Sequence, residues 1–470
     1  MLIGQELHNG WNRMSNSDRI IDEVKGKEVV LFNSPLYRES FDDGETYLPP
    51  LGQGYILTHL NQSGIAAGLV DAVYHKLGTE EVIRIINCST FHTVGFNVFS
   101  VNMNLVRDMI AGIDREVHVV LGGKAVGAVW RDIASWNVRQ RLSLIIGEGE
   151  WIFPDIVRGT CSDDILYETD RCRVYQVGIR SGYFPADLDK SVLDRSLFMN
   201  RAVYNHYGKL EQCMIASRGC IYRCAFCGGS TYANRHIPVR FRSSENIQDE
   251  IQKIVKLTPG VQSIRILDDL FLKDVNSIRS ASDIFLKFPG IYWRAMAHIQ
   301  SFHNAEAYIE RLKESGCDEL FVGIESGSPK IRKMIHKEGS IERVKEVIRL
   351  LLTAGIDVKG YFMCGFPEET EDDLLQTLQL AEEIKRCAVS AKGNFRAVAF
   401  RFRPYHGTEL YDRLVKENCA MKKYETRIQK GTKTQYNFSA GNFSCVTDEA
   451  ISDFLERITD DRYNYKMPEV

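Results

Sequence analysis

The chain has 470 residues, of which 44% are hydrophobic and 26% charged, so it has enough apolar content for two or three hydrophobic cores. Its formal net charge is -3 and it contains no long block of lysine and arginine, which argues against nucleic acid or an anionic membrane as its partner. It has neither an apolar run of about 18 residues nor a signal peptide, so we expect a cytoplasmic protein that acts on small molecules.

Apolar strands alternate with helical stretches through the first part of the chain. A buried strand begins at Val29, and a stretch with helical spacing over residues 52–64 ends at a glycine. Four further strands are predicted at 67–73, 93–99, 117–123 and 143–150. Such alternation predicts an α/β fold with a doubly wound parallel sheet, in which ligands bind beside the carboxyl ends of the strands. We place this first, Rossmann-like domain at residues 1–160.

A more polar segment follows at residues 161–211. It contains the polar run 161–164 and the turn-prone stretch 181–187. We therefore expect it to connect the first domain to a second one, because the alternation of strands and helices resumes at residue 212.

Three cysteines, Cys220, Cys224 and Cys227, form the most specific motif of the sequence. Three thiolates so close together can hold three corners of a [4Fe–4S] cluster and leave one iron open to a cofactor or substrate. The alternative is a zinc or structural site, but zinc prefers four ligands, and no fourth cysteine or histidine lies at a partner spacing nearby. The remaining nine of the 12 cysteines show no disulfide spacing, so we expect them to be thiols.

A series of predicted strands surrounds this motif. The strand at 212–217 delivers the cysteines into a loop, and later strands are predicted at 263–271, 293–297 and 319–327. A strand and turn at 358–370 and a last motif at 396–408 complete the series. In barrels of parallel strands, active sites are built at the carboxyl ends of the strands.

The C-x3-C-x2-C spacing, with Phe226 before its last cysteine, resembles the radical S-adenosylmethionine (radical SAM) superfamily, and the later strand motifs follow in that superfamily's order. The resemblance implies a partial (β/α)6 barrel over residues 212–410, a [4Fe–4S] cluster held by the three cysteines, and S-adenosylmethionine (SAM). It also implies an external one-electron reductant of the flavodoxin or ferredoxin type. In such enzymes SAM is cleaved reductively to a 5′-deoxyadenosyl radical, which abstracts hydrogen from a small-molecule substrate.

The same resemblance suggests which residues bind SAM. They are Phe226, Gly228, Gly229, Arg294, Glu325 and Ser326. The phenylalanine would cover the adenine, the glycines would let the loop approach the cofactor, and the glutamate and serine would lie near the ribose and amine. A plain turn explains the glycines nearly as well, and a buried ion pair with a neighbouring arginine is the alternative for the glutamate.

Polar residues at other strand ends are candidates for the substrate site. Asp268 and Asp269 could bind the substrate or act as a general acid or base, although only one of two adjacent strand residues can point inward. The other would be solvated or cap a helix. Further candidates for binding an anionic or hydroxylated substrate are Arg294, Tyr361, Arg401, Arg403 and His406.

The first domain resembles the cobalamin-binding-type domain that precedes the barrel in one radical SAM subfamily. The matching pieces are residues 48–52, Gly122 with Gly123, and residues 147–150, and the paired glycines would leave space for the nucleotide tail of a corrin. The signature that supplies cobalt with a histidine in many cobalamin proteins is absent after the first strand, and His75 lies in the wrong loop. Cobalamin binding and a role as scaffold or substrate lid both stay open.

Residues 411–470 are predicted to form a small, mainly helical cap that could close the mouth of the barrel. Its aromatic residues are Tyr424, Phe438, Phe443 and Tyr463. A lid of this kind would exclude water and protect a radical.

Two functional classes compete. The enzyme would carry out radical chemistry on a biosynthetic or natural-product substrate, either by cobalamin-dependent C-methylation or as a cobalamin-independent dehydratase, cyclase or isomerase. The remote alternative is a non-enzymatic iron–sulfur electron-transfer or sensor protein. Glu325, Ser326 and the series of barrel strands favour the enzyme, because electron transfer needs no cavity.

Overall fold

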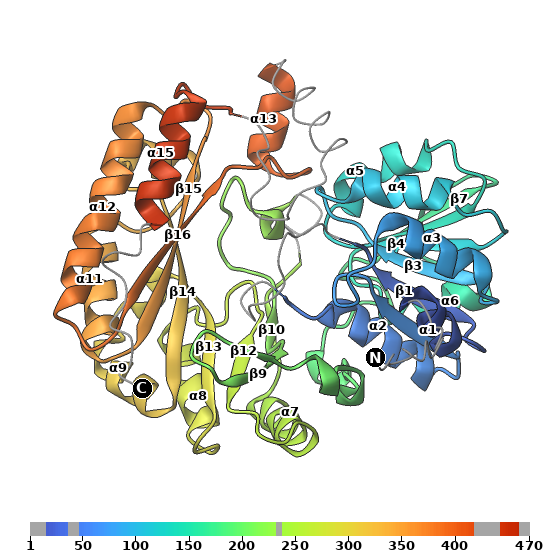
Figure 1. The fold of residues 1–470 in the computed structure, drawn as a ribbon, viewed down its shortest axis with the longest axis horizontal. Coiled ribbons are helices and arrows are strands. Elements are labelled where there is room, and N and C mark those ends of the chain that lie inside the picture. Colours follow the sequence, from blue (N-terminus) through green and yellow to red (C-terminus); the bar gives the residue numbers. More distant parts are fainter. Residues whose placement is uncertain (1–15, 36–46, 232–236, 418–441, 460–470) are drawn as a thin grey trace, which may run out of the picture.

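The computed structural model describes residues 16–35, 47–231, 237–417 and 442–459. Its strands form two large sheets that lie side by side, one within residues 29–176 and the other within residues 203–401 (Figure 1). A short ribbon of β10 (Ser217–Arg218) and β11 (Arg240–Phe241) accompanies the second sheet. In the described part of the chain, no helix has the length and apolar character to cross a membrane.

The first sheet has seven strands in the order β2-β1-β3-β4-β5-β7-β6, and only β6 pairs antiparallel. The strands are β1 (Val29–Asn33), β2 (Ala67–Asp71), β3 (Thr93–Asn97), β4 (His118–Gly122), β5 (Arg141–Ile146), β6 (Ile165–Glu168) and β7 (Cys172–Gln176). Successive residues of β1 enter two different hydrophobic clusters, as expected of a strand buried on both faces.

Helices cover both faces of this sheet. One face carries α2 (Leu51–Gln62) and α6 (Phe153–Arg158), and the other carries α1 (Asn16–Glu23), α3 (Thr79–Cys88), α4 (Met103–Ala111) and α5 (Val126–Ala134). The predicted doubly wound parallel sheet is therefore confirmed.

Residues 161–211 contribute strands to the first sheet, whereas the sequence interpretation treats the whole segment as a connector. The strands β6 and β7 lie in this segment and extend the first sheet. Cys172 and Val174 pack on one face of the sheet and Tyr175 on the other. Both strands are short and have polar neighbours, so their sequence patterns are weak. We propose that the first domain ends after β7, before the 3₁₀ turns η1 (Leu188–Lys190) and η2 (Arg195–Arg201).

The second sheet is curled into a half barrel (Figure 1), in the order β16-β15-β14-β13-β12-β9-β8. The strands are β8 (Val203–Tyr204), β9 (Leu210–Met214), β12 (Ser263–Ile266), β13 (Tyr292–Ala297), β14 (Cys317–Glu325), β15 (Asp357–Cys364) and β16 (Phe395–Arg401). Six of them are parallel and follow chain order, and only β8 is antiparallel. The predicted partial (β/α)6 barrel is confirmed.

Helices pack on the outer face of the barrel. They are α7 (Ser244–Leu257), α8 (Val275–Phe285), α9 (Ile309–Glu314), α11 (Ile341–Thr353) and α12 (Glu371–Val389). The other helical elements of this half are α10 (Pro329–Met334), α13 (Glu409–Glu417), η3 (Gly228–Ser230), η4 (Ile299–Phe302) and η5 (Glu306–Tyr308). Along β15, Val358 and Phe362 face this outer core and are fully buried, whereas Lys359 and Tyr361 alternate with them and are half-buried. The inner face of the barrel therefore keeps contact with solvent.

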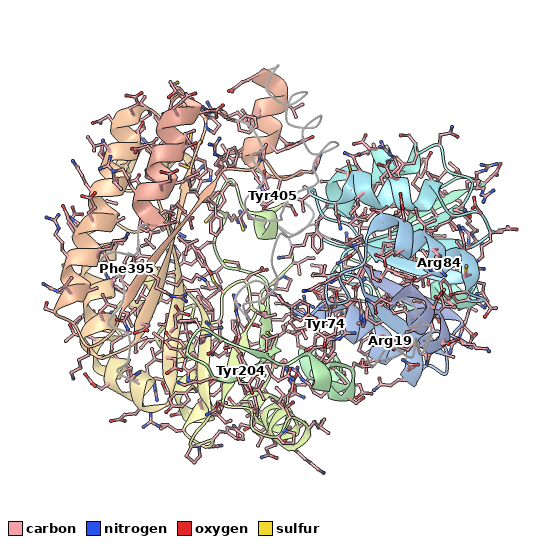
Figure 2. All side chains as sticks on the ribbon, viewed as in Figure 1. Arg19, Tyr74, Arg84, Tyr204, Phe395 and Tyr405 are labelled. Atoms are coloured by element: carbon pink, nitrogen blue, oxygen red, sulfur yellow. The ribbon has the colours of Figure 1, made fainter. Side chains whose placement is uncertain are left out.

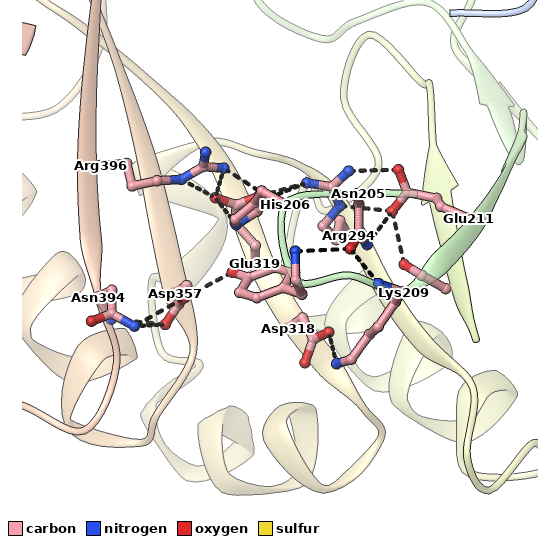
Figure 3. Close-up of polar contacts among 12 residues, drawn as sticks. Asn205, His206, Lys209, Glu211, Arg294, Asp318, Glu319, Asp357, Asn394 and Arg396 are labelled. Atoms are coloured by element: carbon pink, nitrogen blue, oxygen red, sulfur yellow. Dashed lines mark hydrogen bonds and ion pairs between the residues drawn. The ribbon is translucent and has the colours of Figure 1, made fainter. Parts of the chain in front are cut away.

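A layer of paired charges lies toward the amino ends of the barrel strands (Figure 3). Arg294 on β13 is fully buried, and its guanidinium lies 2.5 Å from Glu211 on β9 and 3.0 Å from Glu319 on β14. Arg396 on β16 also bonds to Glu319, at 3.1 Å. The cysteines follow the opposite, carboxyl end of β9. Arg294 is therefore not placed to bind SAM, although the sequence interpretation predicted that it would.

The C-terminal helix α15 (Asp448–Thr459) packs on the outside of the barrel rather than over its mouth. Ile451, Phe454 and Ile458 join the same hydrophobic core as Phe395 on β16. The mainly helical C-terminus is confirmed, but α15 is no lid, because its apolar stripe is used on the outer face. Phe443 packs against Phe402, and the other predicted cap aromatics, Tyr424, Phe438 and Tyr463, lie outside the described residues.

The two halves contact each other through loops that follow strands of both sheets. Lys124, after β4, pairs with Asp269, after β12, with Nζ and Oδ1 2.8 Å apart. The backbone N–H of His406 donates to Ser100 Oγ at 3.1 Å. The neighbouring Tyr405 lies on the side of the barrel that faces the first sheet (Figure 2).

Candidate active site

Asp268 fixes the start of the cysteine loop. Its carboxylate accepts hydrogen bonds from the backbone N–H of Ala216, at 2.8 Å, and from Ser217 Oγ, at 2.6 Å. The residue is only 3% exposed, and burial raises the pKa of its carboxyl to about 7 although these hydrogen bonds lower it. We interpret Asp268 as a positioning residue rather than the catalytic group expected from the sequence, because protein groups occupy both of its oxygens.

A second tie joins the loop to the first sheet. Arg218 forms ion pairs with Glu148 and Glu150, which follow β5. These acids belong to the segment 147–150, one of the pieces that resemble the cobalamin-binding-type domain. Gly219 follows with a φ of +94°, a conformation that favours glycine, so the chain turns into the cysteine loop at this point.

The three cysteine thiols lie in one electrostatic cluster. Burial raises the pKa of each thiol, to about 12 for Cys224, and the neighbouring thiols raise it further for Cys220 and Cys224. The backbone N–H of Gly229 donates to the sulfur of Cys227 at 3.4 Å, the kind of hydrogen bond that surrounds cluster sulfurs. Buried thiols of this kind become thiolates when a metal binds them.

The arrangement fits a cluster better than a single zinc ion. Among the described residues, no three His, Cys, Asp or Glu side chains converge closely enough to hold one metal ion. Tetrahedral zinc needs sulfurs about 3.8 Å apart, given a Zn–S bond of about 2.3 Å. A [4Fe–4S] cluster attaches each thiolate to a different iron, so its ligands stand further apart. Three cysteines can ligate three irons of such a cluster and leave the fourth iron open, whereas a structural zinc site takes four ligands.

Glu325 ends β14 in a strained conformation beside the cysteine loop. Its φ is +66°, and the pairing of β14 with β15 shifts register between Gly323 and Glu325. Such backbone strain costs about 1–3 kcal/mol and is concentrated at functional sites. The carboxylate pairs with Lys337 Nζ at 3.2 Å, and the two side chains are 9% and 7% exposed. The ion pair predicted as the alternative role exists, but with a lysine instead of an arginine.

Ser326 points into the protein. Its Oγ lies 3.0 Å from Thr377 Oγ1 and accepts a hydrogen bond from the backbone N–H of Ser328 at 3.1 Å. The residue has no exposed surface. These contacts account for its hydroxyl, so the expected contact with SAM has no support in the structure.

Phe226 and the two glycines are chain neighbours of Cys227. Phe226 is half-buried and packs against Phe366, with ring centroids 5.8 Å apart. A Cβ added at Gly228 would meet nothing within 4 Å, and one at Gly229 would lie 3.5 Å from Cys227 Sγ. Neither glycine has a positive φ. The turn itself therefore does not require glycine, whereas a cofactor that approaches Gly228 closely would.

The other predicted strand-end residues divide between the two faces of the barrel. Tyr361 lies on the inner face, with its ring centroid 5.9 Å from that of Phe400. Arg401 faces outward and pairs with Asp448 of α15 at 3.1 Å, so it does not face the substrate space. Arg403 and His406 are buried.

Two lysines near the cysteines are absent from the sequence interpretation. Lys337 lowers the pKa of Cys220 and Cys224, and Lys124 has the same effect on Cys227, although burial outweighs both. Lys124 follows the paired glycines, which is a signal that could have found it. Lys337 belongs to no sequence motif and reaches the site only through the fold.

The paired glycines of the first domain have different roles. Gly123 has a φ of +114°, and a Cβ there would lie 2.6 Å from the backbone oxygen of Val98. Its conformation and the nearby chain therefore require glycine without any ligand. Gly122 has no positive φ, and a Cβ there would meet nothing within 4 Å. The open space that a bulky ligand needs thus lies at Gly122.

Residues 214–381 match the sequence profile of the Radical SAM superfamily. Together with the cysteine loop and the half barrel, this match identifies a radical SAM domain within the chain, a type of domain that uses a [4Fe–4S] cluster and SAM. An uncharacterized methyltransferase of Pyrococcus horikoshii is 24% identical over 393 residues, which cover 80% of this chain and 82% of the relative. The anaerobic magnesium-protoporphyrin IX monomethyl ester cyclase of Rubrivivax gelatinosus is 22% identical over 75% of this chain and 65% of its own.

Solved structures share the arrangement of both sheets. The radical SAM methyltransferase TsrM of Kitasatospora setae, solved with cobalamin and a [4Fe–4S] cluster, has a TM-score of 0.61 at 15% identity, over 83% of this chain and 78% of its own. The cobalamin-dependent radical SAM enzyme OxsB, solved with aqua-cobalamin, has a TM-score of 0.61 at 17% identity, over 92% of this chain but 59% of its own. The likeness concerns the fold, and OxsB contains segments that this chain does not match.

We expect the Asp268→Asn variant to change how stability depends on pH. The folded carboxyl keeps its proton up to about pH 7, whereas an unfolded aspartate loses it near pH 3.9. The wild type therefore loses stability as the pH rises through this window. The variant does not, because its amide carries no titrating proton. In urea denaturation, the unfolding free energy of the variant should increase relative to that of the wild type by up to about 1.4 kcal/mol per pH unit.

Asp269→Asn is the matched control, because it removes a partly exposed carboxylate from the adjacent position. If the unfolding free energies of wild type and Asp268→Asn changed in parallel with pH, the buried carboxyl would already be ionised below neutral pH. That result would contradict our interpretation.

Proposed function

We propose that this protein is a cobalamin-dependent radical SAM methyltransferase that acts on a small-molecule substrate. The observation that carries the proposal is the meeting of two strand edges. Lys124, after β4 of the first sheet, pairs with Asp269, after β12 of the barrel, next to the cysteine loop. Gly122, with open space beside it, lies two residues from this lysine. A ligand at this edge of the first sheet would adjoin both the cluster and the barrel interior.

The comparisons support this proposal. The likeness to TsrM and OxsB extends over both halves of the chain, and both structures contain cobalamin. The Pyrococcus relative, which this chain matches over most of its length, is named a methyltransferase.

Within this proposal, the chain's residues hold the reactants in place. Cys220, Cys224 and Cys227 would ligate three irons, and Glu325 would bind the amine or ribose of SAM. When bound, the cluster and SAM supply the 5′-deoxyadenosyl radical, and cobalamin supplies the methyl group. The half-exposed inner face of β15 and β16 would hold the substrate. We propose that the electron comes from a separate protein of the flavodoxin or ferredoxin type.

A cobalamin-independent reaction is the second candidate. The Rubrivivax relative is named a cyclase, which supports a radical cyclisation that uses the same cysteines and SAM. In the cobalamin-independent case the first domain would serve as a scaffold. An electron-transfer role has less support, because it gives no function to a barrel whose inner face stays accessible to solvent.

Replacing Cys220, Cys224 or Cys227 singly with Ala should abolish both the cluster absorbance near about 400 nm and the formation of 5′-deoxyadenosine, since each variant removes a ligand. Both are measured after anaerobic reconstitution, with dithionite and SAM. Cys88→Ala is the control, because Cys88 is exposed at the end of α3. Full turnover by any of the three variants would refute the cluster assignment.

Glu325 and Lys337 can be separated by a double variant. Glu325→Gln or Lys337→Met alone leaves a buried charge without its partner and should cost about 3–5 kcal/mol of unfolding free energy. The double variant removes both charges and should recover most of this stability, as measured by urea denaturation. If Glu325 binds SAM, its loss should weaken SAM binding by about 1.5–3 kcal/mol in equilibrium dialysis.

The SAM affinity of the double variant decides between the two roles. A SAM-binding glutamate predicts that the affinity stays low although stability returns, with the cluster absorbance intact. Recovery of affinity together with stability would reduce Glu325 to the partner of Lys337.

Cobalamin binding can be tested at Gly122. Anaerobic wild-type protein mixed with hydroxocobalamin should retain it through gel filtration, and Gly122→Leu should block retention by filling the open space. Gly123→Leu would strain the backbone and is not informative. Gly182→Leu is the control, because Gly182 is exposed, lacks a positive φ and has nothing within 4 Å of its Cβ position.

The bound form should be base-off, without a protein nitrogen on cobalt, because the described residues directly after β1 include no histidine. Methyl transfer with retained cobalamin would establish the methyltransferase. A wild-type protein that stays free of cobalamin while it forms 5′-deoxyadenosine would favour the cobalamin-independent reaction.

A further inference from the structure

Arg265 is a buried cation without an anionic partner. It lies on β12, where its neighbours Ile264 and Ile266 face the outer core and its own side chain faces the barrel interior. The residue is 8% exposed. No hydrogen bond or ion pair joins its guanidinium to any residue that the structure describes, and Nη1 is buried without an acceptor.

The surroundings of Arg265 are aromatic and positively charged. Its guanidinium carbon lies 4.9 Å from the ring centroid of Phe321, and Lys359 Nζ lies 6.0 Å from the same centroid. Arg294 is 5.4 Å from this ring too, but it and Arg396 are balanced by the two glutamates of the charged layer. Stacking on an aromatic ring offsets only part of the cost of burying a guanidinium. Arg265 therefore lacks the carboxylate that buried arginines usually have.

The inner face of the barrel runs from Arg265 past a row of aromatic rings to the candidate active site. On the inner face of the barrel, Tyr361 lies 6.3 Å from Phe321 and 5.9 Å from Phe400, measured between ring centroids. These three rings form an aromatic wall, of which Tyr361 and Phe400 keep contact with solvent. Farther along the same face, β14 ends at Glu325, beside the cysteines.

We propose that Arg265 binds an anionic group of the substrate, a carboxylate or a phosphate, while the body of the substrate lies against the aromatic wall. The inference rests on the proposed function, which puts the substrate inside the barrel with its reacting carbon toward the cluster. A planar guanidinium can donate two parallel hydrogen bonds to such a group. The substrate would thus supply the partner that the chain does not.

Binding of simple probes tests this directly. The probes are 3-phenylpropanoate, phenyl phosphate and the neutral 3-phenylpropanamide, titrated into the full-length protein with its reconstituted cluster and followed by ligand-detected NMR. Wild type should bind at least one anion and bind the amide at least about tenfold more weakly, because only the anion pairs with the guanidinium. The preferred anion identifies the group that the site takes.

Substitutions at Arg265 complete the test. Arg265→Met should weaken anion binding at least about tenfold and leave amide binding unchanged, whereas Arg265→Lys keeps the charge and should retain part of the affinity. Arg279→Met, on the exposed side of α8, is the control for a lost charge. Unfolding temperature and cluster absorbance show whether each variant is folded, and Arg265→Lys remains informative if Arg265→Met does not fold.

Wild type that binds neither anion, or that binds the anions no better than the amide, overturns the proposal. Equal anion binding by wild type and Arg265→Met overturns it as well. Since these readouts need neither SAM cleavage nor cobalamin, a protein that binds anions without methylating would contradict the proposed function and not this inference.

Discussion

The hydrogen bonds that Asp268 accepts from Ala216 and Ser217 determine where the cysteines lie. They hold the chain, as it leaves β9, against the end of β12, so the loop opens at the carboxyl edge of the barrel. A buried carboxyl is costly to desolvate, and these two hydrogen bonds offset part of that cost. Any shift between β9 and β12 would break them, which couples the register of the barrel to the position of the thiols.

The barrel separates stability from chemistry along its axis. Toward the amino ends of the strands, Arg294 and Arg396 pair with Glu211 and Glu319, so four strands are held by charges that balance one another. Toward the carboxyl ends lie the cysteine loop and the strained Glu325. This division agrees with the general behaviour of parallel barrels, in which the carboxyl ends carry the active site and the amino ends contribute stability.

The contacts between the two halves differ in strength around the cysteine loop. Arg218 and Glu148 are mostly buried, with 18% and 19% of their side chains exposed, so their ion pair is shielded from solvent. Lys124 and Asp269 are 52% and 39% exposed, and pairs of that kind contribute about 0–1 kcal/mol. A ligand that enters between the halves beside Lys124 would therefore break only an ion pair that contributes little to stability.

The sequence by itself determined the strands of both sheets, except the short β6, β7 and β8. It also determined the cysteine loop. Both were predictable because apolar periodicity and cysteine spacing are local properties of the chain. Only the tertiary structure decided what each charged side chain meets. Arg294 pairs with glutamates, Arg401 faces outward, and Asp268 holds a loop, although all three lie near strand ends in the sequence. Lys337 and Arg265 gained their significance in the same way. The physical reason is that strand pairing brings together segments far apart in the chain, and the partner of a buried charge is set by that packing and not by its neighbours in sequence.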